Sequence, residues 1–253
     1  FFTNMGRVYW CKVYEIPQAG RLGRGQAVVN LLNFGADEHL TTVLAVKDVD
    51  PGYHVLMATK TGLVKKTDLM AYSRPRAGGI IALDLVEGDE LIAARITDGT
   101  MNVFLGAANG KSIRFHESDV RPTGRVSRGM RGIRLDAGDS LVAMEVLSHG
   151  QTLISITENG YGKRTSIDEY PLQKRGGKGV ITIKTTRRNG KVVGILLVSE
   201  DDDLMLMTNA GKIIRMPIEG VSVISRNTQG VRLMGLDPEE HVIGAVRLAE
   251  KDK

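Results

Sequence analysis

The chain has 253 residues, 42% of them hydrophobic, and it carries a formal net charge of +5 at pH 7. This length and apolar content are enough for one large domain, or two small ones, with a buried core. Cys11 is the only cysteine, which excludes an internal disulfide, and no apolar run approaches the ~18 residues of a membrane-spanning helix. The sequence therefore predicts a soluble protein of a reducing cytoplasm.

One sequence plan recurs five times, over about residues 1–50, 51–99, 100–150, 151–200 and 201–250. Each copy contains an apolar run, a short polar turn that ends in glycine, and a basic run. The turn glycines follow one another at 48 to 56 residues and are Gly6, Gly62, Gly110, Gly160 and Gly211. A second glycine comes 17 to 22 residues later, before another apolar run, at Gly25, Gly79, Gly132, Gly179 and Gly230.

The sequence around the turn glycines predicts β-hairpins. Residues 153–157 and 161–165 flank Asn159-Gly160, a pair that tolerates positive φ in a tight turn. Residues 180–183 and 133–135, which follow the second glycine, are β-branched or alternating runs typical of strands. Helical periodicity is sustained nowhere for more than about two turns.

Four strands in each unit of roughly 50 residues predict an all-β fold with a propeller-like array of small sheets. No single unit can bury both faces of its sheet, so neighbouring units must stack. Two β-sandwich domains are the alternative, but they would give irregular spacing between the repeats.

Charge is segregated within each repeat. Acidic residues gather at the turn before the last apolar run, as at Asp136 and Asp139, and none lies between Tyr170 and Ser199. The segments between the two landmark glycines are basic and contain Arg21 and Arg24, Arg74 and Arg76, Arg121, Arg125, Arg128 and Arg131, Lys174, Arg175 and Lys178, and Arg226. The basic runs that follow the turn glycines include Lys65, Lys66, Lys163 and Arg164.

If equivalent positions lie on one rim, these cations form a basic perimeter suited to a long polyanion. Aromatic residues make up only 5% of the chain and are not interleaved with the cations, which disfavours single-stranded nucleic acid. No helix is available to enter a major groove and read bases. Backbone-directed, sequence-independent binding and bending of duplex DNA is the function that this pattern favours.

The segment Gln173-Lys174-Arg175-Gly176-Gly177-Lys178-Gly179 concentrates these features. Its glycines allow close approach of the backbone to a partner, and its three cations suit phosphate. A glycine-rich turn with solvated lysines is the alternative interpretation of the same residues.

No catalytic or metal-binding constellation is predicted. Residues 109–112 (Asn-Gly-Lys-Ser) lack the earlier glycine of a nucleotide-binding loop, because that position is Leu105. The five histidines are scattered and have no cysteine partners, so a zinc site is not expected.

The segment 173–179 resembles the box motif of the C-terminal domain family of the bacterial DNA gyrase A protein, with lysine where arginine is commoner. Residues 28–32, 132–135, 158–165 and 226–231 resemble the same family. The resemblance implies one β-pinwheel domain over residues 1–253, a propeller-like ring or spiral of four-stranded blades with about five blades in this chain.

The resemblance also implies a function in which the basic rim wraps duplex DNA and supports ATP-dependent negative supercoiling. The implied partners are DNA, the gyrase B protein and the catalytic core of the gyrase A protein, in the bacterial cytoplasm at the nucleoid. The fragment itself is expected to be monomeric, to carry no catalytic residue and to bind no cofactor, since ATP and magnesium are used elsewhere in the holoenzyme.

The chain departs from the family pattern in two ways. The family usually has six blades with its principal box in the first, so the five repeats here correspond to blades two to six, and the first blade is expected before Phe1. The acidic tail after the last blade is absent. The similar C-terminal domain of topoisomerase IV, whose boxes are degraded, is one alternative, and a protein-interaction propeller with a basic rim is another.

Overall fold

The computed structural model describes residues 1–18, 25–74, 76, 78–148 and 150–248. These residues form β-strands and short 3-10 helices and contain no α-helix, so the predicted all-β class is confirmed. The chain separates into two compact units. The first comprises Phe1–Gly99 with Val120–Met130, and the second comprises Thr100–Asp119 with Arg131–Lys253.

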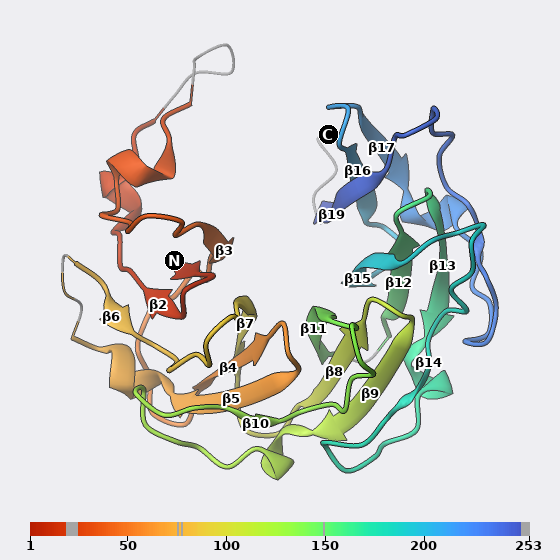
Figure 1. The fold of residues 1–253 in the computed structure, drawn as a ribbon. Helices are drawn as coiled ribbons and strands as arrows, with labels where there is room; N and C mark the ends of the chain where they lie inside the picture. The colour runs from red at the N-terminus through yellow and green to blue at the C-terminus, as the bar shows by residue number, and fades with distance from the viewer. Residues whose placement is uncertain (19–24, 75, 77, 149, 249–253) are drawn as a thin grey trace. The chain divides into compact units, whose positions relative to one another are not determined.

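The first unit contains two four-stranded sheets (Figure 1). The strand order of one sheet is β3 (Leu40–Thr42), β1 (Phe2–Thr3), β2 (Arg7–Val8) and β6 (Ile80–Ile81). The order of the other is β10 (Met130–Arg131), β5 (Leu63–Asp68), β4 (His54–Thr59) and β7 (Leu91–Thr97). Their facing sides bury one apolar cluster that includes Phe2, Val55, Met57 and Tyr72.

The second unit contains three sheets, coloured green to blue in Figure 1. The first has the order β11 (Leu141–Leu147), β8 (Asn102–Ala107), β9 (Lys111–His116) and β14 (Val180–Ile181). The second has the order β15 (Val192–Val198), β12 (Thr152–Thr157), β13 (Tyr161–Ser166) and β18 (Val231–Arg232). The third has the order β17 (Ile213–Pro217), β16 (Asp203–Thr208) and β19 (Val242–Leu248).

The fifth repeat contains the four predicted strands, β16, β17, β18 and β19. Its sheet has three strands in the described part of the chain because the short strand β18 pairs with β13 of the sheet before it. Apolar side chains fill the space between successive sheets of the second unit, as the stacking argument requires. Phe104, Leu153 and Ile195 belong to one cluster, and Ile154, Leu206 and Val242 belong to the next.

The predicted hairpins are confirmed. Strands β12 and β13 pair antiparallel with Ser155 opposite Lys163, and Gly160 closes the turn at φ 77° with its N–H bonded to the Thr157 carbonyl. A single turn of 3-10 helix follows the second strand of each hairpin in several repeats. The 3-10 helices are η1 (Val13–Glu15), η2 (Val28–Asn30), η3 (Leu69–Tyr72), η4 (Glu117–Asp119), η5 (Ile167–Glu169) and η6 (Ile218–Gly220).

The short strand after the second glycine pairs with the hairpin of the preceding repeat. Strand β6 pairs with β2, β14 with β9, and β18 with β13. Each four-stranded sheet is thus completed by the following repeat, an exchange that the repeat pattern alone did not predict. The corresponding segment of the first repeat, Val28–Asn30, is a 3-10 helix instead of the predicted strand.

The pairing also corrects one landmark. The short strand of the third repeat is β10, Met130–Arg131, so the equivalent glycine is Gly129 and not Gly132. A strand was predicted at residues 133–135 because Ile133 and Leu135 alternate with a polar residue. Ile133 is instead a core residue just beyond the strand, with 2% of its surface exposed.

Candidate nucleic-acid interface

The segment between each 3-10 helix and the next short strand will be called a connection; residues 120–129, 170–179 and 221–230 are the three described in full. A single parallel β-bridge joins each connection to the hairpin of the preceding repeat. The bridges are Lys66 to Pro122, Arg114 to Leu172 and Arg164 to Val223. They align the connections residue by residue, which makes Arg125, Arg175 and Arg226 equivalent.

These three arginines donate to backbone carbonyls. The Nη1 atom of Arg125 lies 3.3 Å from the Ile81 oxygen, that of Arg175 lies 2.9 Å from the Arg131 oxygen, and that of Arg226 lies 2.9 Å from the Ile181 oxygen. Each accepting residue is the second residue of a short strand, β6, β10 or β14. The arginines therefore fasten each connection to the short strand before it.

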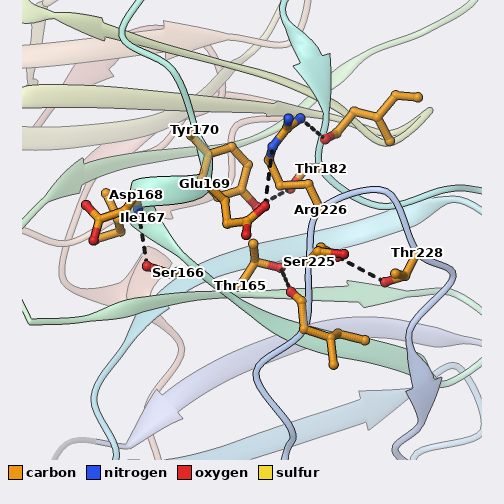
Figure 2. A network of polar contacts seen from close by, with 12 residues as sticks. Thr165, Ser166, Ile167, Asp168, Glu169, Tyr170, Thr182, Ser225, Arg226 and Thr228 are labelled. Atoms are coloured by element: carbon orange, nitrogen blue, oxygen red, sulfur yellow. Dashed lines mark hydrogen bonds and ion pairs between the residues drawn. The ribbon is translucent and has the colours of Figure 1, made fainter.

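Figure 2 shows this arrangement around Arg226. The Arg226 guanidinium lies 5.9 Å from the centre of the Tyr170 ring and 4.0 Å from a Glu169 carboxylate oxygen. The Tyr170 hydroxyl is 2.7 Å from the Thr182 hydroxyl, and both residues are buried. The connection is thus held by a network that leaves 27% of the Arg226 side chain exposed.

Two predicted DNA-binding lysines are buried. Lys65 is 1% exposed and Lys163 is 0% exposed. The Lys65 ammonium donates to the carbonyls of Ala82, at 2.7 Å, and Arg125, and the Lys163 ammonium donates to those of Ser225, at 2.5 Å, and Arg226. Burial lowers the pKa of each lysine to about 8. These ammonium groups hold the connections from inside and present no charge to a ligand.

Lys66 and Arg164, also predicted to bind DNA, are 4% and 5% exposed. Arg164 donates from Nε to the Val221 carbonyl at 2.6 Å and from Nη2 to Glu200 at 3.0 Å. We therefore leave the four buried cations out of the candidate surface. Sequence alone could not separate them from solvated cations, because a basic residue in a strand gives the same pattern in both cases.

A Lys163→Met variant is expected to lose part of the pH dependence of stability. Because the folded pKa of Lys163 lies below its unfolded value of about 10.4, the folded state binds fewer protons between these values, and the unfolding free energy rises with pH. Between about pH 7.5 and 9.5 this lysine should contribute a rise on the order of 1–2 kcal/mol, which the variant lacks.

Urea unfolding at both pH values measures the change in unfolding free energy. Comparing the wild type with the Lys163 variant cancels the contributions of the other titrating groups. The exposed Lys178→Met serves as the control and should keep the wild-type slope. An identical pH slope in the Lys163 variant would mean that the ammonium is not destabilised by burial.

The remaining predicted cations within the described residues lie at the surface. Lys174 has 90% of its side chain exposed and contacts Asp119 at 2.9 Å, and Arg128 contacts Asp84 at 3.2 Å with 68% exposed. The Arg128–Asp84 pair is exposed on both sides and contributes little stability, so a phosphate can replace this carboxylate at low cost. The exposed predicted cations are Arg74, Arg76, Arg121 and Arg128 in the first unit, and Arg131, Lys174 and Lys178 in the second. Arg21 and Arg24 lie outside the described residues.

The segment 173–179 lies along β9, and its glycines serve different purposes. Gly179 has φ 69°, and a Cβ atom there would lie 2.0 Å from the Ser112 carbonyl oxygen, so only glycine allows β14 to approach β9 this closely. Gly176 has φ 80°, whereas Gly177 has an ordinary φ and at least 3.6 Å of space. Gln173 donates its backbone N–H to the Arg114 carbonyl.

Arg175 is the structural cation of this segment. It donates to the carbonyls of Asp119, at 2.7 Å, and Arg131, at 2.9 Å. Lys174 and Lys178 are left as the exposed cations on either side. The structure therefore combines both interpretations of the heptad: a glycine-constrained turn that displays two lysines.

Further exposed cations of the second unit were not predicted as DNA-binding residues, among them Lys184, Arg187, Arg188 and Arg232. The absence of acidic residues between Tyr170 and Ser199 could have indicated the first three of these residues, but the prediction used it only for the connection. In the described residues no three His, Cys, Asp or Glu side chains are grouped to hold a metal ion. Nor does the described part of the chain include a helix long and apolar enough to cross a membrane.

This chain is similar to solved structures named for DNA topoisomerase IV and for DNA gyrase, and to curated sequences named for DNA gyrase. The structure titled C-terminal domain of DNA topoisomerase IV has a TM-score of 0.90 at 25% identity, over 97% of this chain and 77% of that chain. The structure titled DNA gyrase A C-terminal domain has a TM-score of 0.84 at 27% identity, over 98% of this chain and 80% of that one. The DNA gyrase A protein of Salmonella typhimurium is 47% identical over 250 residues, and that of Escherichia coli K12 is 46% identical over 249.

Each of these sequence alignments covers 98% of this chain, which spans 28% of the length of the relatives. The family described as the DNA gyrase C-terminal domain, a beta-propeller, matches residues 1–47, 53–98, 102–148, 151–199 and 202–249. Each matched segment lies within one of the five predicted repeats. The chain therefore belongs to the DNA gyrase C-terminal domain family.

Proposed function

We propose that the chain binds, bends and wraps duplex DNA without sequence specificity, through phosphate contacts from the exposed cations of its connections and short strands. The observation that carries this proposal is the recurrence of exposed cations on backbone segments that the protein itself immobilises. Arg125, Arg175 and Arg226 fasten these segments, while residues such as Arg121, Arg128, Lys174 and Lys178 remain exposed. Binding then requires little ordering of the protein, which favours affinity.

The whole protein that contains this chain acts, in this proposal, as part of DNA gyrase, an ATP-dependent type II topoisomerase of the bacterial cytoplasm that introduces negative supercoils. The gyrase B protein and the catalytic core of the gyrase A protein are the partners, and they use the ATP and magnesium. This chain supplies no catalytic residue and binds no cofactor. The curated relatives, which are named as DNA gyrase, support gyrase over topoisomerase IV.

Salt dependence tests the phosphate contacts. If six to ten phosphates are engaged, log K should fall with log salt at about −0.9 per phosphate, so raising salt from about 50 to 200 mM should weaken binding roughly a thousandfold or more. Seven exposed predicted cations are available for these contacts. The measurement is a titration of labelled duplex DNA at several salt concentrations.

A slope shallower than about −3 would exclude an extended path on the protein. The length of the DNA separates wrapping from docking of an acidic protein, because bending is offset only when several blades contact one duplex. A duplex of ~40 base pairs should therefore bind more tightly than one of ~12 base pairs after correction for the number of sites. Equal corrected affinities would favour the protein-interaction alternative.

A further inference from the structure

Two exposed arginines flank one buried tyrosine in the second unit. Tyr161 begins β13 and is 6% exposed, and Arg232 of β18 lies opposite it in register. The guanidinium carbons of Arg188 and Arg232 lie 4.8 and 5.6 Å from the centre of the Tyr161 ring. Arg232 also donates from Nη2 to the Tyr161 hydroxyl at 3.1 Å. Stacking on the ring and this hydrogen bond hold both guanidiniums beside Tyr161.

No carboxylate forms an ion pair with either guanidinium in the described part of the chain. Hydrogen bonds from Arg188 and then Arg232 hold the pKa of the Tyr161 hydroxyl below its ordinary value. Two like charges that line one pocket without a paired counter-ion favour the binding of an anion there.

The arginines line an open pocket of about 340 Å³ together with Asn159 and the turn 235–241. Within this turn the Glu240 carboxylate is already occupied: it accepts from the Thr208 hydroxyl at 2.7 Å and from the Asp237 N–H at 3.0 Å. Asp237 and Glu239 also line the pocket and are exposed. These carboxylates disfavour a polyanion that lies across the whole pocket. The pocket therefore suits a single phosphate group bound by the arginines.

The equivalent turns of other repeats carry the opposite charge. The backbone hydrogen bonds Lys60 to Glu90, Ala108 to Ser140, Glu158 to Lys191 and Asn209 to His241 align four of these turns. The residue before each acceptor is Asp89, Asp139, Gly190 and Glu240. The fourth repeat thus has glycine where three others have a carboxylate, and it places Arg187 and Arg188 just before it.

We propose that Arg188 and Arg232, braced by Tyr161, form a phosphate-binding fork that holds one backbone phosphate of duplex DNA apart from the connections. The inference rests on the proposed DNA-binding function. Paired guanidiniums supply parallel N–H donors that match phosphate oxygens, which a single lysine cannot do. The ring fixes their spacing before DNA arrives, so little side-chain entropy is lost on binding.

The test compares the salt dependence of duplex DNA binding for wild type and Arg188→Gln/Arg232→Gln. Loss of one phosphate contact should reduce the slope by about 0.9 and the affinity about eightfold at 0.1 M salt. Lys47→Gln/Lys60→Gln removes the same net charge from exposed positions outside the pocket and should leave the slope unchanged. Arg188→Gln alone, in an exposed turn, should reproduce much of the loss without touching β18.

A wild-type slope near zero would overturn the proposed function itself. If the wild-type slope is steep but the arginine and lysine double variants both keep it, only the fork is overturned. The same holds if the slope falls by an equal amount in both double variants. Arg188→Lys/Arg232→Lys, which keeps the charge but loses the parallel donors, should bind more weakly than wild type at every salt concentration. If this variant binds DNA with wild-type affinity, the positive charge of the two residues binds DNA and the parallel N–H donors of a fork are not required.

Discussion

Replacing Gly179 with alanine is expected to destabilise the second unit by about 2–4 kcal/mol. Two effects add at this position. The backbone has φ 69°, which L side chains rarely adopt, and the new Cβ atom would lie 2.0 Å from the Ser112 carbonyl oxygen. The atoms that the new Cβ would meet belong to the backbone of Ser112 and Ile113, which cannot move aside as a side chain can. Strand β14 must therefore shift away from β9, which weakens their pairing. Thermal and urea unfolding of the variant measure the loss.

Gly177→Ala is the matched control from the same segment. Its Cβ atom would have its closest neighbour, Ile113 Cδ1, at 3.6 Å, and its φ is ordinary. Stability should therefore change by less than about 1 kcal/mol, with a small gain from the stiffer unfolded chain. If both alanine variants unfold alike, close packing of the short strand is not what requires glycine at Gly179.

Replacing Lys174 and Lys178 together with glutamine is expected to weaken DNA binding about 60-fold at 0.1 M salt. If each lysine contacts one phosphate, the double replacement lowers the salt slope by about 1.8. Both side chains are exposed and neither supports the fold, so the melting temperature should stay near that of the wild type. DNA titration across salt concentrations, with thermal unfolding in parallel, measures both quantities.

Arg175→Gln provides the contrast. This arginine donates to the Asp119 and Arg131 carbonyls, so its replacement should lower stability and leave the salt slope closer to that of the wild type. An unchanged slope in the double lysine variant would remove the segment 173–179 from the DNA-binding surface. A slope that falls only in the Arg175 variant would reverse the roles assigned to these cations.

Local chemistry made several features predictable from the sequence. A turn such as Asn159-Gly160 restricts φ and ψ within two residues, and the flanking runs alternate over a few more, so the hairpins needed no knowledge of distant contacts. The recurrence of these signals at 48 to 56 residues predicted repeated sheets that stack. The exposed cations Lys174, Lys178, Arg121 and Arg128 were also found in this way, because they lie in the basic connections that recur with the repeat.

Features that depend on contacts far along the chain could only be seen in the tertiary structure. Lys163 is buried because the carbonyls of Ser225 and Arg226, 62 and 63 residues away, receive its ammonium group. The exchange of β14 onto β9 is set in the same way by a glycine that lets one backbone pass against another. The sequence by itself determined the repeated hairpins and the basic connections, since both follow from neighbouring residues. Tertiary structure alone decided which cations support the fold and which face solvent, because burial depends on partners that sequence distance does not reveal.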